Sequence, residues 1–293
     1  MGASSSHTRF AEIRARLEGI TPPAGPWAWI YEFLLFGFKQ AWACLFGGLL
    51  LALLLTTHLF YPAEAGFARY DFLTLSALAI QIGLLALRLE TWDEAKVILA
   101  FHVVGTVMEL FKTAVGSWVY PEPNVLRIAG VPLFSGFMYA AVGSYIARVW
   151  RIFDFRFTAY PSRALSAALA VAIYINFFAH HWLPDLRLAL FAALTLLFAR
   201  TRIWFRPWRA ERWMPLLLGW LLVALFIWFA ENLATFSRAW IYPDQREGWA
   251  LVHPGKLGAW YLLMYISFVL VAAVHRPRPR TVPPAKGSLA SCS

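Results

Sequence analysis

The sequence predicts an all-α integral membrane protein of about eight transmembrane helices, arranged as two parallel four-helix repeats with the N- and C-termini cytoplasmic. Composition is the first reason. Of the 293 residues, 60% are hydrophobic and 14% are charged, whereas soluble domains are about half apolar and about a quarter charged. The second reason is a series of long apolar segments, and the third is a motif that occurs twice.

The apolar segments lie at about 41–60, 71–88, 97–119, 131–148, 163–182, 186–200, 213–237 and 257–274. Most of them reach the length of about 20 residues that crosses the roughly 30 Å hydrocarbon core of a bilayer. The sixth is the shortest and is flanked by Asp185 and Arg200. Residues 27–39 are also rich in apolar side chains, and we expect them to form a helix that lies in the membrane interface.

The basic residues indicate the orientation. With the N-terminus inside and eight spans, nineteen of the 26 Lys and Arg residues fall on the cytoplasmic side and six fall outside. This bias agrees with the positive-inside rule and places the chain in the inner (plasma) membrane. The net charge of +10 is therefore explained by topology. The expected partner is the lipid bilayer, with no nucleic acid, and the sequence gives no oligomeric state.

These observations divide the chain into four parts. Residues 1–26 are expected to be a cytoplasmic N-terminal tail, and residues 276–293 a disordered cytoplasmic C-terminal tail rich in Pro, Gly and Ser. Between them lie a first four-helix repeat at 27–160 and a second at 161–275.

The repeat is visible as a motif of Glu, Thr, Trp, Tyr and Pro. Its residues are Glu109, Thr113, Trp118, Tyr120 and Pro121 in the first copy and Glu231, Thr235, Trp240, Tyr242 and Pro243 in the second. His58 and His180 match at the same offset of 122 residues. Because each half has an even number of spans, the halves should be parallel and related by an axis along the membrane normal. Glu109 and Glu231 are then expected to converge near the centre of the bundle.

Carboxylates inside a membrane indicate a functional site, because a charge at the bilayer centre costs roughly 2.5–3.5 kcal/mol even on insertion scales. The candidate catalytic residues are Glu109, Glu231, Lys112, His58 and His180. The candidate substrate-binding residues are Thr113, Thr235, Trp118, Tyr120, Trp240, Tyr242 and His102. The conserved order of Trp and Tyr in both copies exceeds what aromatic anchoring at a membrane interface requires.

Lys112 follows Glu109 by three residues, so the two side chains are placed to form an ion pair on one helix face. A neutral packing pair would explain Glu109 without any function. Ala234 occupies the matching position in the second half, however, so Glu231 needs another partner. A duplicated Glu without a duplicated cation favours a functional role.

Two Glu and two His are ligands that a di-metal centre in a helix bundle uses. The sequence lacks the Glu-x-x-His spacing of such centres. We therefore predict no metal, and the sequence identifies no cofactor.

Four stretches resemble a known family. MELFKTAVGSWVYPEP, GVPLFSGFMYA, WFAENLATFSRAWIYPDQ and KLGAWYLLMYISF resemble a bacterial family of multi-pass membrane proteins known as domain of unknown function 817. The resemblance covers residues 27–275. It implies a multi-pass membrane fold and no particular activity.

A looser resemblance is to carotenoid hydratases and to lycopene cyclases built from small membrane domains. The residues that carry it are Glu109, Gly116, Trp118, Tyr120, Gly130 and Pro132. The cyclases have a pair of Glu residues directly after that proline. This chain has Phe134 and Ser135 there, which departs from the cyclase pattern.

Three kinds of function are compatible with these residues. In an enzyme, an apolar lipid or isoprenoid would enter between the halves, and the paired Glu side chains would act as acid and base. In a proton- or cation-coupled transporter of a small molecule, the same acids would be the coupling groups near the midplane. In a structural or sensory protein, the acids would only hold helices together.

Overall fold

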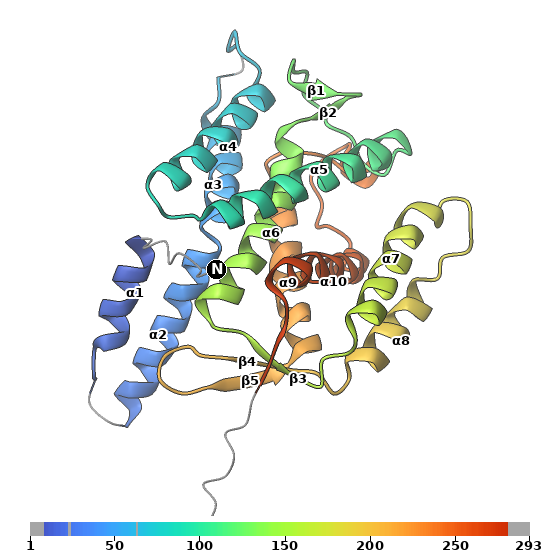
Figure 1. Cartoon of the computed structure of the whole chain (residues 1–293). Coiled ribbons are helices and arrows are strands. Elements are labelled where there is room, and N and C mark those ends of the chain that lie inside the picture. Colours follow the sequence, from blue (N-terminus) through green and yellow to red (C-terminus); the bar gives the residue numbers. More distant parts are fainter. Residues whose placement is uncertain (1–8, 23–24, 63, 281–293) are drawn as a thin grey trace, which may run out of the picture.

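The computed structural model describes residues 9–22, 25–62 and 64–280. These residues form ten α-helices and a few short strands (Figure 1). The helices are α1 (Arg9–Gly19), α2 (Pro26–Ala43), α3 (Leu45–Phe60), α4 (Arg69–Ala86), α5 (Trp92–Ala114), α6 (Phe134–Ile152), α7 (Arg163–Ala179), α8 (Arg187–Phe198), α9 (Leu216–Phe236) and α10 (Gly255–His275). The mostly helical fold that the sequence predicts is confirmed.

Each of the eight apolar segments contains one helix, from α3 to α10. By length and composition, three helices, α5, α9 and α10, can cross a membrane. The α2–α3 pair, which is bent by 68° at its break, can supply a fourth span. The predicted eight spans exceed this number because α7 and α8 are short and because α4 and α6 carry charged side chains within their ends.

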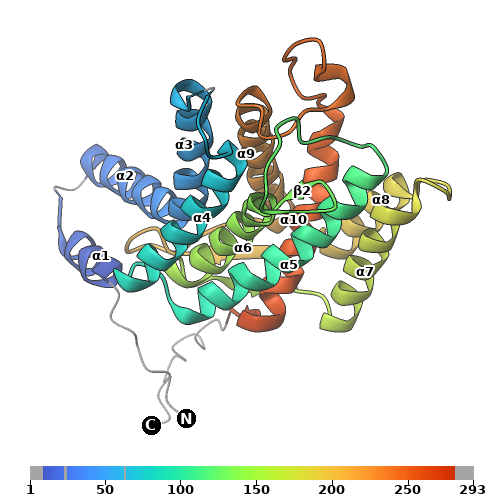
Figure 2. The ribbon, with the colours of Figure 1, turned by 90° about the horizontal axis from the view of Figure 1, so that it is seen from above.

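Helix α6 lies at the centre of the bundle. It packs against α5 most extensively and also contacts α2, α3, α4 and α10 (Figures 1 and 2). Its charged residue Arg148 is completely buried and forms an ion pair with Glu90 at 3.0 Å. Arg148 is one of the nineteen basic residues that the charge count assigned to a cytoplasmic loop or tail, but it is buried within α6. A buried cation requires such a partner, because burying an unpaired charge is costly.

Small residues allow α5 and α6 to approach closely. A Cβ atom added at Gly105 of α5 would lie 2.6 Å from the side chain of Tyr139 on α6. A Cβ atom added at Gly136 of α6 would lie 2.6 Å from His102 and Thr106 on α5. Close backbone approach at small residues is a common basis of helix packing in membranes.

A small sheet joins the ends of several helices. Its four strands, in the order β5–β4–β3–β6, are β3 (Arg156–Thr158), β4 (Arg202–Phe205), β5 (Arg212–Pro215) and β6 (Arg278–Pro279). β3 and β4 are antiparallel, with Phe157 opposite Ile203, and β6 runs parallel to β3. A separate hairpin is formed by β1 (Arg127–Ile128) and β2 (Val131–Pro132) at the other end of the molecule (Figure 1).

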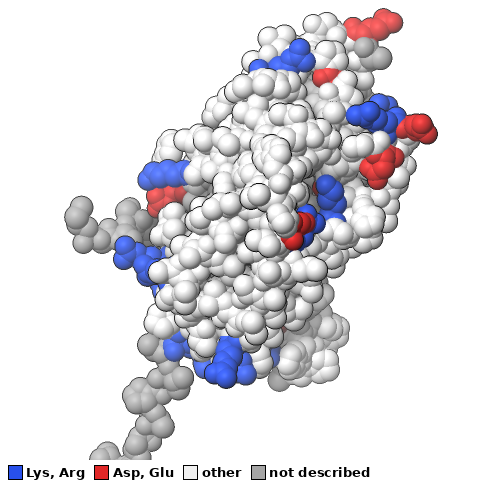
Figure 3. Space-filling model, turned by 90° about the vertical axis from the view of Figure 1, so that its right-hand side faces the viewer, with Lys and Arg blue, Asp and Glu red and all other residues white. Residues whose placement is uncertain are grey.

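The structure describes part of each of the two predicted tails. Helix α1 lies within the segment 1–26, and β6 lies within the segment 276–293. The remaining disorder predicted for the C-terminal tail concerns residues 281–293, which lie outside the described residues. In Figure 3, basic side chains gather at the lower end of the molecule, the level at which Figure 1 places the four-stranded sheet, and much of the face above is uncharged.

Replacing Gly105 with Ala tests the close packing of α5 and α6. We expect a loss of about 1–3 kcal/mol in the free energy of unfolding, because the added methyl group overlaps Tyr139. Thermal unfolding in detergent measures the change. Gly83→Ala on α4 is the matched control, since a Cβ atom there meets no atom within 4 Å. Equal stability of both variants and the wild type would contradict the predicted contact.

Candidate functional site

The site is built on the C-terminal ends of α5 and α9, which have the same backbone hydrogen bonds. Ser117 N donates to Lys112 O at 2.9 Å, and Ala239 N donates to Ala234 O at 3.0 Å, 122 residues later. The residue before each donor, Gly116 or Arg238, has a left-handed backbone conformation, with φ of 75° and 57°. Left-handed caps of this kind end helices and redirect the chain.

Beyond these caps, the two chain segments pair with each other. The N–H of Val119 donates to the carbonyl of Ile241 at 3.1 Å, and the N–H of Ile241 donates to the carbonyl of Val119 at 3.0 Å. This antiparallel bridge joins residues that occupy matching positions in the two copies of the motif. Helix α4 adds a further link, because Arg69 donates to the carbonyl of Ser237 at 2.6 Å at the end of α9.

The carboxyl group of Glu109 is enclosed by three uncharged donors. Trp118 Nε1 and Tyr120 Oη both donate to Oε2, at 2.7 and 2.5 Å. Tyr139 Oη of α6 donates to Oε1 at 2.8 Å. The side chain is buried, so its hydrogen bonds come from the protein instead of water.

The carboxyl group of Glu231 has two such donors. Tyr242 Oη donates to Oε1 at 2.5 Å, and Trp260 Nε1 of α10 donates to Oε2 at 2.7 Å. Tyr242 is the counterpart of Tyr120, so this bond repeats the first half. Trp260 has no such counterpart, because Met138 occupies the matching position. Tyr261, which matches Tyr139, instead reaches the carbonyl of Leu217 at 3.4 Å.

Aromatic contacts connect the two carboxyl groups. The ring of Trp118, which binds Glu109, lies 6.0 Å from the ring of Tyr242, which binds Glu231. The ring of Tyr139 lies 6.5 Å from that of Trp260. The two acids therefore share a continuous aromatic layer, although no hydrogen bond joins them directly.

The Tyr120 and Tyr242 side chains act as donors in this layer. Burial and the neighbouring Glu109 carboxylate raise the pKa of Tyr120 well above its usual value. Burial and the Glu231 carboxylate raise the pKa of Tyr242 in the same way. Both phenols therefore keep their protons and can continue to donate to the acids.

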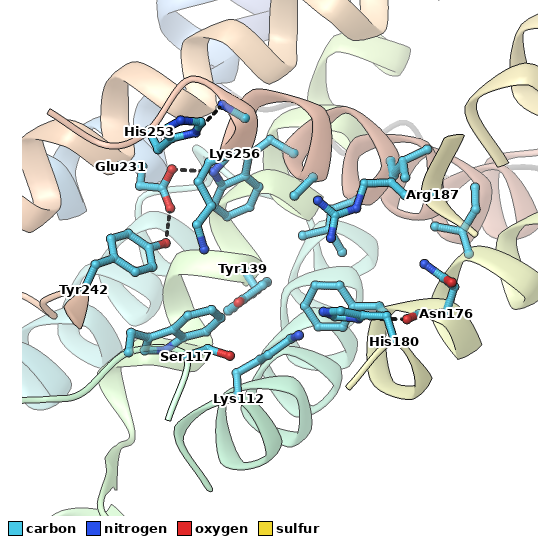
Figure 4. Close-up of a pocket in the computed structure, with 18 residues that line it drawn as sticks. Lys112, Ser117, Tyr139, Asn176, His180, Arg187, Glu231, Tyr242, His253 and Lys256 are labelled. Carbon is cyan, nitrogen blue, oxygen red and sulfur yellow. Dashed lines mark hydrogen bonds between the residues drawn. The ribbon is translucent and has the colours of Figure 1, made fainter. Parts of the chain in front are cut away.

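A cavity of about 530 Å³ lies beside this layer and is lined by residues of α5 to α10. Its volume falls within the range of about 300–1,000 Å³ that is common for small-molecule pockets. Figure 4 shows Glu231 and Tyr242 on one side and Asn176 and His180 of α7 on the other. The lining residues lie in the C-terminal halves of α5, α7 and α9 and in the N-terminal halves of α6, α8 and α10.

Three cations and one carboxylate line the cavity. The cations are Lys112 of α5, Arg187 of α8 and Lys256 of α10, and the carboxylate is Glu231 (Figure 4). Arg187 forms an ion pair with Asp185 at 3.1 Å. The Lys256 ammonium group lies over the Tyr242 ring, 4.3 Å from its centroid. The wall of the cavity is therefore positively charged overall.

The structure brings five of the predicted site residues to this cavity. They are Glu231, Lys112, His180, Trp118 and Tyr242. Glu109 and Tyr120 lie directly behind the lining, because Trp118 and Tyr139, which line the cavity, both donate to Glu109.

The remaining predicted residues lie elsewhere. His58 packs against Phe236, with ring centroids 5.4 Å apart, and His102 packs against Phe137 at 4.4 Å. Trp240 is buried in the core, and Thr235 donates to the carbonyl of Asn232. Thr113 lies on α5, outside the cavity lining.

The pairing of Lys112 with Glu109 that its spacing suggested is not formed. Lys112 Nζ instead lies 2.9 Å from Nε2 of His181 and 4.2 Å from the centroid of the Phe177 ring. The physical reason is that the two side chains point in different directions. Glu109 faces α6 and its tyrosine, whereas Lys112 extends toward the helix end and α7.

Sequence reasoning missed Lys256, Trp260, Arg187 and His253, which also line the cavity. Lys256 and Arg187 were counted only as charges outside the membrane. Both stand within the first two residues of an apolar helix, and this position was the available signal. Among the residues that the structure describes, no three His, Cys, Asp or Glu side chains are grouped as a metal site requires.

The fold and its apolar helices indicate a helical membrane protein. The chain belongs to the family described as Protein of unknown function (DUF817), which matches residues 32–268, so the resemblance predicted from the motifs is confirmed. It is similar to the Uncharacterized protein YoaT of Bacillus subtilis (strain 168), with 41% identity over 256 residues, covering 86% of this chain and 95% of the relative. No solved structure matches the chain. These comparisons lend no support to the likeness to carotenoid-pathway enzymes.

Tyr139→Phe tests the enclosure of Glu109. We expect a loss of about 1–3 kcal/mol in the free energy of unfolding, because a buried acceptor loses its donor. Tyr261→Phe, at the matching position, is the control and should cost less, because its hydrogen bond is long at 3.4 Å. Denaturant or thermal unfolding in detergent compares the two. A larger loss for Tyr261→Phe would show that the assignment of Tyr139 is wrong.

Proposed function

We propose that this chain is a multi-pass protein of the inner (plasma) membrane that transports a small molecule and uses Glu231 as its proton-coupling group. In this proposal the helices α3 to α10 form eight spans. Residues 27–160 and 161–275 form two parallel halves related by an axis along the membrane normal, and both termini are cytoplasmic.

Exposed apolar side chains support eight spans. Three of the helices that are too short or too polar by composition, α4, α7 and α8, still present large apolar residues on their surfaces. Examples are Ile82 on α4, Ile175 on α7 and Leu196 on α8, with exposed fractions of 58%, 57% and 79%. Helix α8 extends about 18 Å over its twelve residues. Arg200, two residues after the end of α8, can reach one interface with an extended side chain.

The matched helix ends support two related halves. The caps of α5 and α9 have identical hydrogen-bond patterns, and Val119 pairs with Ile241 through two reciprocal hydrogen bonds. A residue that pairs with its own counterpart in this antiparallel manner lies close to a two-fold axis. The sequence similarity of the two motifs agrees with this symmetry.

Cysteine labelling tests the topology. In a background with Cys44 and Cys292 replaced by Ala, Val125→Cys in the hairpin region should react with a membrane-impermeant maleimide on intact cells. Arg209→Cys, between β4 and β5, should react only after the membrane is permeabilised. Both sites are solvent-exposed in the structure. Reaction of both cysteines on intact cells would contradict the proposed orientation.

The observation that carries the transport proposal is the position of Glu231. It is the one carboxylate on the cavity wall among the described residues, and the cavity is lined by residues of α5 to α10 and of the segments that follow α5 and α9. Coupling acids of transporters occupy such positions between repeats. Glu109 is screened from the cavity by the side chains of its own donors. Acid–base catalysis by two carboxylates would require both to reach one substrate, and this geometry favours transport over that mechanism.

Glu231→Gln should abolish coupled proton movement. Proteoliposomes that contain a pH-sensitive dye are given hexanesulfonate, hexyltrimethylammonium or hexanol, which differ in charge and share a short chain. We expect one probe to cause a proton flux in the wild type and no flux above that of empty liposomes in Glu231→Gln. Glu247→Gln, in the loop after α9 and outside the cavity lining, is the control and should behave like the wild type. Proton flux that is equal in the two variants would falsify the coupling role.

An enzyme acting on an apolar lipid or isoprenoid is the second candidate. The observation that favours it is the aromatic wall of Trp118, Tyr242 and Trp260 around Glu231, since such rings stabilise cationic intermediates. An enzyme would convert a component of a lipid extract in detergent, without any gradient, and would lose this activity in Glu231→Gln.

A further inference from the structure

We infer that the cavity binds an anionic amphiphile, with an acidic headgroup held between Lys112 and Lys256 and an apolar chain lying against α7 and α10. This inference rests on the proposed function in one respect, that the cavity is the ligand site. It adds the chemical class of the ligand.

The first argument is the charge of Lys112. Its side chain is only 4% exposed, and it forms no ion pair with any carboxylate of the described chain. Its polar contact is with the His181 ring nitrogen at 2.9 Å. Buried charges in proteins are normally paired. An acidic ligand in the cavity would supply the missing negative charge.

The second argument is that Glu231 does not neutralise the lysines. Both of its oxygens accept hydrogen bonds from uncharged donors, Tyr242 and Trp260. Lys256 forms no ion pair with Glu231 and instead lies over the ring of Tyr242. Contacts of an ammonium group with ring faces orient it by cation–π attraction. They leave its three N–H groups available to an anion.

The orientation of the basic side chains supports the same position for the headgroup. In Figure 4 the ends of the Lys112 and Lys256 side chains point toward the middle of the cavity from opposite walls, and the Arg187 guanidinium points there from α8. Arg187 already has Asp185 as a partner, so it adds a weaker attraction. A sulfonate, phosphate or carboxylate group fits between the two lysines by charge.

The rest of the wall is apolar. Ile173 and Phe177 of α7 and Leu262 and Leu263 of α10 belong to this apolar part of the lining. Such side chains bury an alkyl or isoprenoid chain favourably, at roughly 25 cal/mol per Å² of apolar surface removed from water. A small inorganic ion would leave this surface unused, so the wall favours an amphiphile over a free anion.

The two halves differ at this point. Ala234 stands at the position that matches Lys112, and Phe134 stands at the position that matches Lys256. Each half therefore contributes one lysine to a single cavity, and the related position across the two-fold axis has neither. The asymmetry assigns one anionic ligand to each chain.

Quenching of tryptophan fluorescence tests the ligand class, because Trp118 and Trp260 line the cavity. The protein is placed in nanodiscs of phosphatidylcholine and titrated with undecyl chains that carry bromine, a quencher, at one end. The other end carries a sulfonate, a hydroxyl or a trimethylammonium group. Competition by sodium sulfate tests the headgroup alone. The variants are Lys112→Met and Lys256→Met. Both keep every tryptophan, so quenching by probe that is merely dissolved in the bilayer is the same in the variants and the wild type.

We expect saturable quenching by the sulfonate only, with affinity reduced about tenfold in each lysine variant, since a hydrogen bond to a charged group is worth that much. Lys112→Arg should keep most of the affinity and shows that a weakened Lys112→Met is not simply misfolded. Lys96→Met is the matched control, because Lys96 is exposed and pairs with Asp93 away from the cavity. Sulfate should compete poorly, because it lacks the apolar chain.

Equal saturable binding of the hydroxyl or trimethylammonium probe would overturn the inference. So would sulfonate binding that is unchanged in both lysine variants, or competition by sulfate as strong as by the amphiphile. These outcomes leave the coupling role of Glu231 standing if its proton flux persists. Conversely, lysine-dependent binding without any Glu231-dependent flux supports the ligand class and refutes transport.

Discussion

The structure depends on supplying hydrogen-bond donors to two carboxyl groups inside an apolar bundle. A buried acid cannot be hydrated, so each of its oxygens needs a partner from the chain. Glu109 and Glu231 meet this requirement with tyrosine and tryptophan side chains, which are apolar over most of their surface and carry one polar group each. The requirement is consistent with the left-handed caps of α5 and α9, because the chain redirected by each cap returns a tyrosine, Tyr120 or Tyr242, to the acid. It also brings the two segments together at Val119 and Ile241.

The same end of the molecule combines symmetry with a difference in charge. The caps and the Tyr–Glu hydrogen bonds occur at both copies of the motif, whereas the lysines do not. The backbone bridge between Val119 and Ile241 joins the two copies directly. The unmatched residues Lys112, Lys256 and Trp260 then define one cavity at the side of that frame. Duplication followed by divergence at a few positions would produce this arrangement.

Much of the fold could be predicted from the sequence, since the eight apolar segments correspond to α3–α10 and periodic hydrophobicity is the strongest sequence signal. The short strands could not be predicted, because two to four residues are too few to show a periodicity. Arg148 was assigned to a cytoplasmic loop because a charged residue in an apolar segment usually indicates the end of that segment. For the site, the repeated motif identified Glu231, Trp118 and Tyr242. Lys256 and Trp260 were not found, because they lie outside the motif. Only the packing of α10 on α9 brings Trp260 to the acid and Lys256 to the Tyr242 ring. Spacing along one helix also suggested the wrong partner for Lys112, since it does not tell which neighbouring helix a long side chain will reach.

The strand β6 has a consequence for movement. It follows the last helix and pairs with β3, which lies in the connection between α6 and α7. The pairing of β6 with β3 joins the last described residues to the middle of the chain, on the side of the molecule that carries the sheet. The bridge between Val119 and Ile241 joins two other segments on the opposite side. Sliding of the joined segments past one another would break the backbone hydrogen bonds at both ends, so the two contacts hold these segments in register.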